Sequence, residues 1–426
     1  MAPIAVESNI SPLVPSEVTT KLPKTTIVGN LDYTSVILSD QEFKESEQAY
    51  EHKSLISVTD DSNWSDPEPF EYHDKALLAD PKTKYSNLFR DATKVVHINP
   101  KIGTVIYGVN LATLDNVQKN ELALLISYRL AVFFKDQRDL TPEKQLDLGA
   151  YFGPLHRHPN GGWVKQPEDS KFPHELLPIY SRTHRSKDEP LYPASNWHTD
   201  VSFEVQPPTY TSLKIVHSPA AGGDTIWSSG YALYDGLSPH LQKYLEGLTA
   251  LHTSVEQTEL YRKSGAHPHR NPITSEHPIV RVHPVTGYKS LYVNPGFTRS
   301  IVGVPRAESN AILKFLFTQI ESSQEATVRY KWGVNDVAFW DNRAALHRAI
   351  ADYRPLKRHG VRVTPRGEPP QGTENGTRGK SQNDEIEAAI ARRRGDAYVT
   401  VETENSKNYR PPKQDLANSV GLRGDA

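Results

Sequence analysis

Residues 336–365 read DVAFWDNRAALHRAIADYRPLKRHGVRVTP, in which two apolar runs lie on either side of a polar turn and a histidine. The first run, 336–340, is rich in Val, Phe and Trp. The second run, 360–365, is rich in Val and Thr. Short runs of β-branched and aromatic residues bounded by turn residues are typical of β-strands. The stretch therefore predicts two strands, with His347 between them.

Similar runs occur on the N-terminal side of this stretch. They read YTSLKIVHS (210–218), KSLYVNPG (289–296) and EATVRYKW (325–332), the last with Ala326, Val328, Tyr330 and Trp332 on one face. The runs are short, are separated by Gly and Pro turns, and are mostly not linked by helices. This pattern favours a mainly β, antiparallel double-sheet fold with flanking helices over a parallel βαβ sheet.

Helices are predicted where capping residues precede a helical pattern. Thr141-Pro142 and Ser238-Pro239 each combine an N-cap residue with proline at the first helical position. In 306–320, apolar residues recur at helical spacing and predict a helix with one buried face. The residues of that face are Ile312, Leu313, Leu316, Phe317 and Ile320.

The composition divides the chain into three segments. Residues 1–90 are expected to form an irregular, partly docked extension, 91–366 a folded domain, and 367–426 a polar, disordered tail that contains a short helix within 384–396. The acidic start and basic end of that helix complement its dipole.

Charge and residue usage exclude several classes of function. The 426 residues carry a formal net charge of -2, so a nucleic-acid partner is not expected. No apolar run is long enough to span a bilayer and no targeting signal is evident, so we expect a cytoplasmic protein without a membrane partner. The chain has no cysteine, which leaves histidine and carboxylate as metal ligands.

The triplet His198-Thr199-Asp200 begins a β-like run, 196–208. Residues two apart in a strand point to the same face, so both side chains can face one ion. His347 is the best third ligand. Two imidazoles and one carboxylate on one face of an octahedral ion leave three positions open, the arrangement of non-haem Fe(II) oxygenases. His267 and His269 form a second candidate pair, but without an evident third ligand they are interpreted as loop residues.

Arg358 and Arg362 lie two strand periods apart in the same stretch. As residues of one strand, both would point to the same face, where two guanidinium groups would bind two anions. The alternative is that both belong to a solvated run of basic residues.

Four ordered motifs resemble the TauD/TfdA family of Fe(II)- and 2-oxoglutarate-dependent dioxygenases, especially its taurine and fungal sulfonate dioxygenases. They read WHTDVSFEVQPP (197–208), PAAGGDTIWSSGYALYDGLSP (219–239), HPIVRVHPVTGYKSLYVNPGFTRSIVGV (277–304) and FWDNRAALHRAIADY (339–353). The resemblance covers about residues 91–366. It implies a double-stranded β-helix, the jelly-roll or cupin-like fold, and a homo-oligomer.

The resemblance also implies roles for individual residues. Fe(II) would be held by His198, Asp200 and His347, and the distal carboxylate of 2-oxoglutarate by Thr225 and Arg358. The substrate anion would be bound by His158 and Arg362. Trp332 would lie near the site or belong to the core, and Asn196 would orient the ligand loop or cap a turn.

The implied reaction consumes O2 and 2-oxoglutarate and hydroxylates the carbon next to sulfur of an alkyl sulfonate. The products would be sulfite, an aldehyde, succinate and CO2. The chain departs from the taurine enzymes at Asn160-Gly161-Gly162, where they have an aromatic residue, and in the longer stretch 166–195. The alternatives are another small anion, such as a sulfate ester, aryloxy acid, purine or secondary metabolite, or a jelly-roll protein that binds a ligand without turnover.

Overall fold

The computed structural model describes most of the chain from residue 45 to residue 395. The described residues are 45, 48–56, 58–59, 62–160, 164–165, 173–181, 197–263, 265, 267–353, 356–373 and 379–395. Asn196, Gly161, Gly162 and most of 166–195, to which the sequence assigned a role at the site, lie outside them. Within the described residues, no helix combines the length and apolar character needed to cross a membrane.

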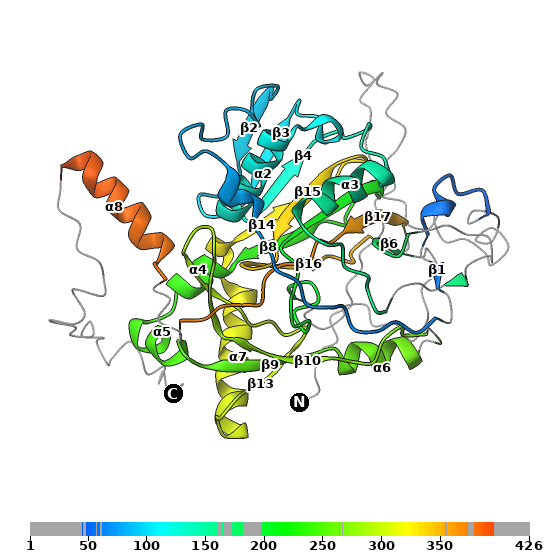
Figure 1. The fold of residues 1–426 in the computed structure, drawn as a ribbon. Coiled ribbons are helices and arrows are strands. Elements are labelled where there is room, and N and C mark those ends of the chain that lie inside the picture. Colours follow the sequence, from blue (N-terminus) through cyan, green and yellow to red (C-terminus); the bar gives the residue numbers. More distant parts are fainter. Residues whose placement is uncertain are drawn as a thin grey trace, which may run out of the picture.

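The largest sheet has seven strands in the order β2-β3-β4-β15-β7-β17-β6. Their bounds are β2 Lys94–His97, β3 Thr104–Tyr107, β4 Ala131–Phe134, β15 Val337–Asp341, β7 Tyr210–His217, β17 Arg358–Val363 and β6 Leu176–Ser181. All neighbouring pairs are antiparallel except β3 and β4. The two runs of 336–365 are thus strands β15 and β17, on either side of β7 (Figure 1).

A second sheet packs on the face of the first. It contains β14 (Thr327–Tyr330), β8 (Thr225–Ser229) and β16 (Ala345–Ala349) in an antiparallel arrangement. Aromatic side chains fill the space between the sheets. The ring of Phe133 stacks on Tyr330 with centroids 4.0 Å apart and lies 5.1 Å from Trp227. The predicted antiparallel double-sheet fold is confirmed.

Shorter strands extend the fold beside these sheets. They are β9 (Thr249–Thr253), β10 (Thr274–Pro278), β13 (Thr298–Ile301), β11 (Val280–Val282), β12 (Lys289–Leu291), β1 (Val58–Thr59) and β5 (Val164–Lys165). The strand predicted over 289–296 ends at Leu291. The Asn294 side chain accepts the backbone N–H of Phe297 at 2.8 Å and so turns the chain.

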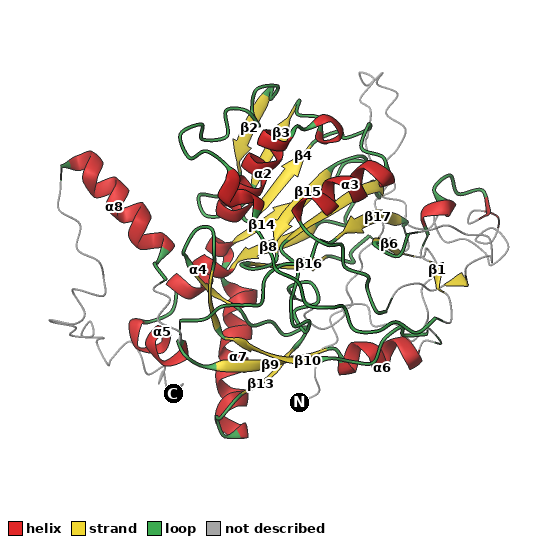
Figure 2. Ribbon diagram, in the orientation of Figure 1, coloured by secondary structure: helices red, strands yellow, loops and turns green. Residues whose placement is uncertain are grey.

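Helices surround the sheets (Figure 2). They are α2 (Asn116–Arg129), α3 (Pro142–Phe152), α4 (Gly230–Asp235), α5 (Pro239–Leu245), α6 (Val255–Lys263), α7 (Arg306–Ser322) and α8 (Gln382–Arg394), with 3-10 turns η2 (Lys53–Leu55), η3 (Lys75–Leu78), η4 (Leu111–Thr113) and η5 (Gln324–Ala326). The Thr141 and Ser238 side chains cap α3 and α5 as predicted. On α7, the predicted face is buried at Leu313, Leu316 and Ile320.

Parts of both terminal segments contact the domain. Asp74 of the N-terminal segment is buried and accepts a hydrogen bond from the hydroxyl of Tyr210 at 2.8 Å. In the C-terminal segment, Lys380 forms a β-bridge with Tyr288, and α8 projects from the body as an arm (Figure 1). The boundaries at residues 90 and 366 stay a prediction.

Two buried histidines outside the proposed site make stability depend on pH. Burial lowers the pKa of His277 and of His359 to about 4 each. Their unfolded values are about 6.5, so the unfolded chain binds more protons between pH 6.5 and 4. The free energy of unfolding is therefore expected to fall as the pH falls through this window. Urea unfolding at pH 7.5 and pH 5 measures the difference, and His359→Asn should reduce it. A stability that rises on acidification would contradict this assignment.

Candidate metal and cosubstrate site

His198 and His347 are neighbours across a β-bridge, although they are far apart in the chain. The backbone N–H of His198 donates to the carbonyl of His347 at 3.0 Å, and the reverse bond is 2.8 Å. The two rings lie with centroids 4.2 Å apart. One strand of the second sheet, β16, therefore carries His347 and also holds the segment that carries His198.

Asp200 completes a cluster with these histidines. One potential ligand atom of each of the three residues lies within 4.8 Å of the others, and among the described residues no other such cluster occurs. The Asp200 Oδ1 atom is 3.7 Å from Nε2 of each histidine and accepts a hydrogen bond from Nη1 of Arg362 at 2.5 Å. Its other oxygen, Oδ2, is buried without a hydrogen-bond partner among the described residues. An orphaned carboxylate oxygen beside two imidazoles fits a bound cation.

The electrostatics of the cluster favour the protonation states that a metal requires. Burial by itself would raise the pKa of Asp200, but Arg362, and then His347 and His198, bring it below its usual range. Burial, with a smaller contribution from His198, lowers the pKa of His347 to about 3. Asp200 is therefore a carboxylate and His347 a neutral imidazole at neutral pH, and these are the forms that bind metal ions.

Thr225 and Arg358 form a polar pair near the cluster of His198, Asp200 and His347. Thr225 pairs with Ala349 in the ladder between β8 and β16, one strand period beyond His347. Directly paired residues point to the same face, so Thr225 lies on the face of His347, roughly 7 Å along the strand. Its hydroxyl accepts hydrogen bonds from Nη2 of Arg358 at 3.3 Å and from the indole N–H of Trp332 at 3.0 Å.

This arrangement selects an anion. With both acceptor sites of the Thr225 hydroxyl used, its O–H remains to donate to a ligand. Arg358 is buried, and its Nε donates to the carbonyl of Gly223 at 2.9 Å, which fixes the plane of the guanidinium. A buried guanidinium beside a hydroxyl donor is suited to a carboxylate. The indole contact also places Trp332 at the site, besides its part in the core.

Arg362 contacts Asp200 directly, and His158 lies close enough to interact electrostatically with both. Nδ1 of His158 accepts the backbone N–H of Asn160 at 3.2 Å, and burial, followed by the charge of Arg362, lowers the pKa of His158 to about 3. The ring is then neutral with its proton on Nε2, where it is a hydrogen-bond donor. Nε of Arg362 is buried with no hydrogen-bond partner within the described residues. The two side chains offer N–H donors beside the group of His198, Asp200 and His347.

Several sequence alternatives are now decided by burial. Only 4% of Arg358 and 11% of the Arg362 side chain are exposed, so a solvated basic run does not describe them. The ring of His269 stacks on Trp64 with centroids 4.1 Å apart, as expected for a structural residue rather than a metal ligand.

Sequence reasoning missed the contribution of the turn 341–343. It was interpreted only as a polar turn, but Asp341, Asn342 and Arg343 are completely buried. Asn342 accepts the backbone N–H of Asp200 through Oδ1 at 3.1 Å. The only sequence signal was the presence of charged and amide residues directly between two apolar strands.

The folded domain is similar in sequence to known proteins. Residues 94–364 match the family described as taurine catabolism dioxygenase TauD, TfdA family. The chain is 45% identical over 342 residues to a putative alpha-ketoglutarate-dependent sulfonate dioxygenase of Schizosaccharomyces pombe, covering 80% of this chain and 86% of the relative. It is 40% identical to an alpha-ketoglutarate-dependent sulfonate dioxygenase of Saccharomyces cerevisiae, covering 70% and 74%.

A solved structure shows the same fold. A putative alpha-ketoglutarate-dependent taurine dioxygenase from Burkholderia xenovorans superposes with a TM-score of 0.55 at 34% identity, and the match covers 66% of this chain and 95% of that one. The predicted double-stranded β-helix is thereby confirmed.

Proposed function

We propose, from the premise that this chain belongs to the TauD/TfdA family of 2-oxoglutarate-dependent dioxygenases, that it is an Fe(II)-dependent enzyme acting on an alkyl sulfonate. Membership of this family makes it an oxidoreductase that uses 2-oxoglutarate and O2, in agreement with the relatives of similar sequence.

His198, Asp200 and His347 are proposed to hold the iron. The single observation that carries this proposal is the cluster of their ligand atoms within 4.8 Å, with Oδ2 of Asp200 orphaned beside them. When bound there with 2-oxoglutarate and O2, the metal supplies the oxidising power that hydroxylates an unactivated C–H bond. The protein supplies position, charge and exclusion of water.

Thr225 and Arg358 are proposed to bind the distal carboxylate of 2-oxoglutarate. The Thr225 O–H would donate to one carboxylate oxygen, and the guanidinium would form a charge-assisted bond to the carboxylate. Thr225 lies one strand period beyond His347 and is contacted by Arg358, which suits a short dicarboxylate whose other end would reach the His198, Asp200 and His347 cluster.

His158 and Arg362 are proposed to bind the sulfonate. The neutral Nε2–H of His158 and the Arg362 guanidinium would donate to sulfonate oxygens and so direct the carbon next to sulfur toward the metal. One O2 then oxidises 2-oxoglutarate to succinate and CO2 and inserts one oxygen atom into the substrate C–H bond. The hydroxylated product eliminates sulfite and leaves an aldehyde. A homo-oligomer and a cytoplasmic location stay predictions.

Turnover of an anionic-substrate panel tests the substrate class. Alkyl sulfonates, sulfate esters and aryloxy acids are assayed for succinate and for sulfite. We expect sulfite in equal amount to succinate with at least one alkyl sulfonate. Succinate formation with a different anion, and no sulfite from any sulfonate, would overturn the sulfonate assignment and retain the enzyme class.

Replacing Arg362 tests how the substrate is bound. Arg362→Met is expected to raise the KM for the sulfonate by roughly 10-fold or more, because one charge-assisted hydrogen bond is worth about 1.5–3 kcal/mol. Arg362 also bonds the proposed ligand Asp200, so both constants are measured at saturating Fe(II). The KM for 2-oxoglutarate should then stay close to that of the wild type, since the carboxylate is assigned to Arg358. An equal rise in both constants would contradict the division of roles between the two arginines.

A further inference from the structure

Asn342 is a completely buried amide that connects the Asp200 segment to the main sheet. Its Oδ1 accepts the backbone N–H of Asp200 at 3.1 Å and the indole N–H of Trp340, also at 3.1 Å. Its Nδ2 donates to the carbonyl of Thr209 at 3.2 Å and to the hydroxyl of Thr211 at 2.6 Å. Each hydrogen-bonding atom of the amide therefore has partners, so the side chain has one defined orientation.

The same turn also supports the histidine ligand. Asn342 lies between β15 and β16, and β16 carries His347. The ring of Trp340, at the end of β15, lies 4.9 Å from the ring of His347 and donates its N–H to Asn342. The Asn342 amide therefore bonds the backbone of Asp200 and also the indole that lies against the His347 ring, so it connects the two residues.

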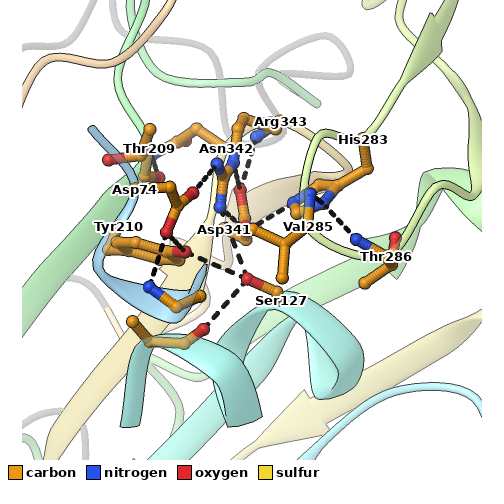
Figure 3. Close-up of polar contacts among 12 residues, drawn as sticks. Asp74, Ser127, Thr209, Tyr210, His283, Val285, Thr286, Asp341, Asn342 and Arg343 are labelled. Atoms are coloured by element: carbon orange, nitrogen blue, oxygen red, sulfur yellow. Dashed lines mark hydrogen bonds and ion pairs between the residues drawn. The ribbon is translucent and has the colours of Figure 1, made fainter. Parts of the chain in front are cut away.

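A buried charge cluster holds the turn itself (Figure 3). The guanidinium of Arg343 donates to both oxygens of Asp341 at 2.8 Å and forms an ion pair with Asp74. Nε2 of His283 lies 2.9 Å from Oδ2 of Asp341. Because removing one member of a buried charge pair is strongly destabilising, this cluster opposes displacement of the turn.

We propose that Asn342 is a positioning residue for the carboxylate ligand Asp200, held in place by the charge cluster of Asp74, His283, Asp341 and Arg343. The inference rests on the proposed function, since it assigns Asp200 to the metal. The backbone of Asp200 would be free to shift without the bond to Asn342, and the carboxylate would then meet the ion in a poorer geometry. Residues that orient metal ligands typically contribute about 10–100-fold to metal affinity.

Gln137 offers a matched control. It is also a buried amide that bonds to backbone groups, accepting Leu111 N–H at 2.8 Å and donating to the carbonyls of Val109 and Lys135 at 2.8 and 2.9 Å. It follows β4, whose end at Phe134 pairs with Val337, the end of β15 opposite to Asn342. Removing either amide leaves buried backbone groups without their partner, but only Asn342 contacts a proposed ligand.

The experiment titrates the purified full chain with Co(II) alone by calorimetry and measures urea unfolding in parallel. Asn342→Ala and Gln137→Ala should both lose stability. Co(II) affinity should weaken about 10–100-fold in Asn342→Ala and stay within about twofold of the wild type in Gln137→Ala. Equal affinities in the two variants, whether retained or lost, would overturn the inference.

A milder variant keeps the test decisive if Asn342→Ala does not fold. Thr211→Val removes one acceptor of the Asn342 amide and leaves the Asp200 contact in place. We expect a several-fold weaker Co(II) affinity, and an affinity equal to that of the wild type would again overturn the inference. Failure of the wild type to bind Co(II) would instead contradict the proposed function.

Discussion

Asp200→Asn is expected to abolish turnover, with a loss of roughly 100-fold or more, because even residues that only orient metal ligands contribute about 10–100-fold. The asparagine amide has nearly the shape of the carboxylate and still offers an oxygen to Arg362. In the wild type, Arg362 Nη1 lies 2.5 Å from Oδ1 of Asp200. The substitution removes the negative charge that the cation requires. Because the hydrogen bond to Arg362 can still form, we expect a folded protein of reduced stability that has lost metal binding.

Anaerobic addition of Fe(II) and 2-oxoglutarate measures this loss directly. The wild type should develop a visible metal-to-ligand charge-transfer band, and Asp200→Asn should not. Asp336→Asn is the control, because Asp336 is another buried carboxylate and pairs with Lys135. It precedes β15, whereas Asn342, the contact of Asp200, follows that strand. An unchanged band in Asp200→Asn would exclude the proposed metal site.

Arg358→Met is expected to raise the KM for 2-oxoglutarate by about 10–100-fold. A charge-assisted hydrogen bond contributes about 1.5–3 kcal/mol, and about 1.4 kcal/mol corresponds to a factor of ten. Arg358→Lys should recover only part of the affinity, because an ammonium group lacks the planar fork that now bonds to Gly223 and Thr225. The KM for the sulfonate should change little.

Arg329→Met is the control for the loss of an arginine close to strand β8, which carries Thr225. Arg329 pairs with Asp224, next to Thr225, but its side chain is 55% exposed. Steady-state kinetics with 2-oxoglutarate as the varied reactant should give a KM close to that of the wild type. If Arg358→Met behaves like Arg329→Met, the distal carboxylate is bound elsewhere.

Local patterns in the sequence predicted several of the strands and helices. The runs 336–340 and 325–332 were predicted as strands and are observed as β15 (Val337–Asp341) and the shorter β14 (Thr327–Tyr330), which follows the 3-10 turn η5. The caps at Thr141 and Ser238 were also predicted correctly. These predictions used residues only a few positions apart, because side-chain alternation and capping act over that distance. The pattern at 289–296 was misleading beyond Leu291, where the Asn294 side chain bonds the backbone and competes with the sheet.

The sequence also determined which residue types could form the site, and the family resemblance supplied their roles. His198 and Asp200 were paired by the alternation of a strand expected over 196–208, but residues 197–208 form no strand: His198 makes an isolated β-bridge and Asp200 lies in a turn. His347 was expected between two strands and lies instead within strand β16. Their grouping within 4.8 Å depends on a β-bridge between residues 198 and 347, which no local pattern specifies.

Only the tertiary structure decided the environment of these residues. By sequence, Arg358 and Arg362 could either face the site or belong to a solvated basic run, and Asp341-Asn342-Arg343 was interpreted only as a polar turn. Both groups are largely buried. Asp74, from a segment expected to be irregular, provides a charge partner for Arg343. Strand alternation and helix capping depend on near neighbours in the chain, so strands and caps could be predicted from local sequence. Burial and ion pairing depend on which distant segments pack together, so the surroundings of the site could not.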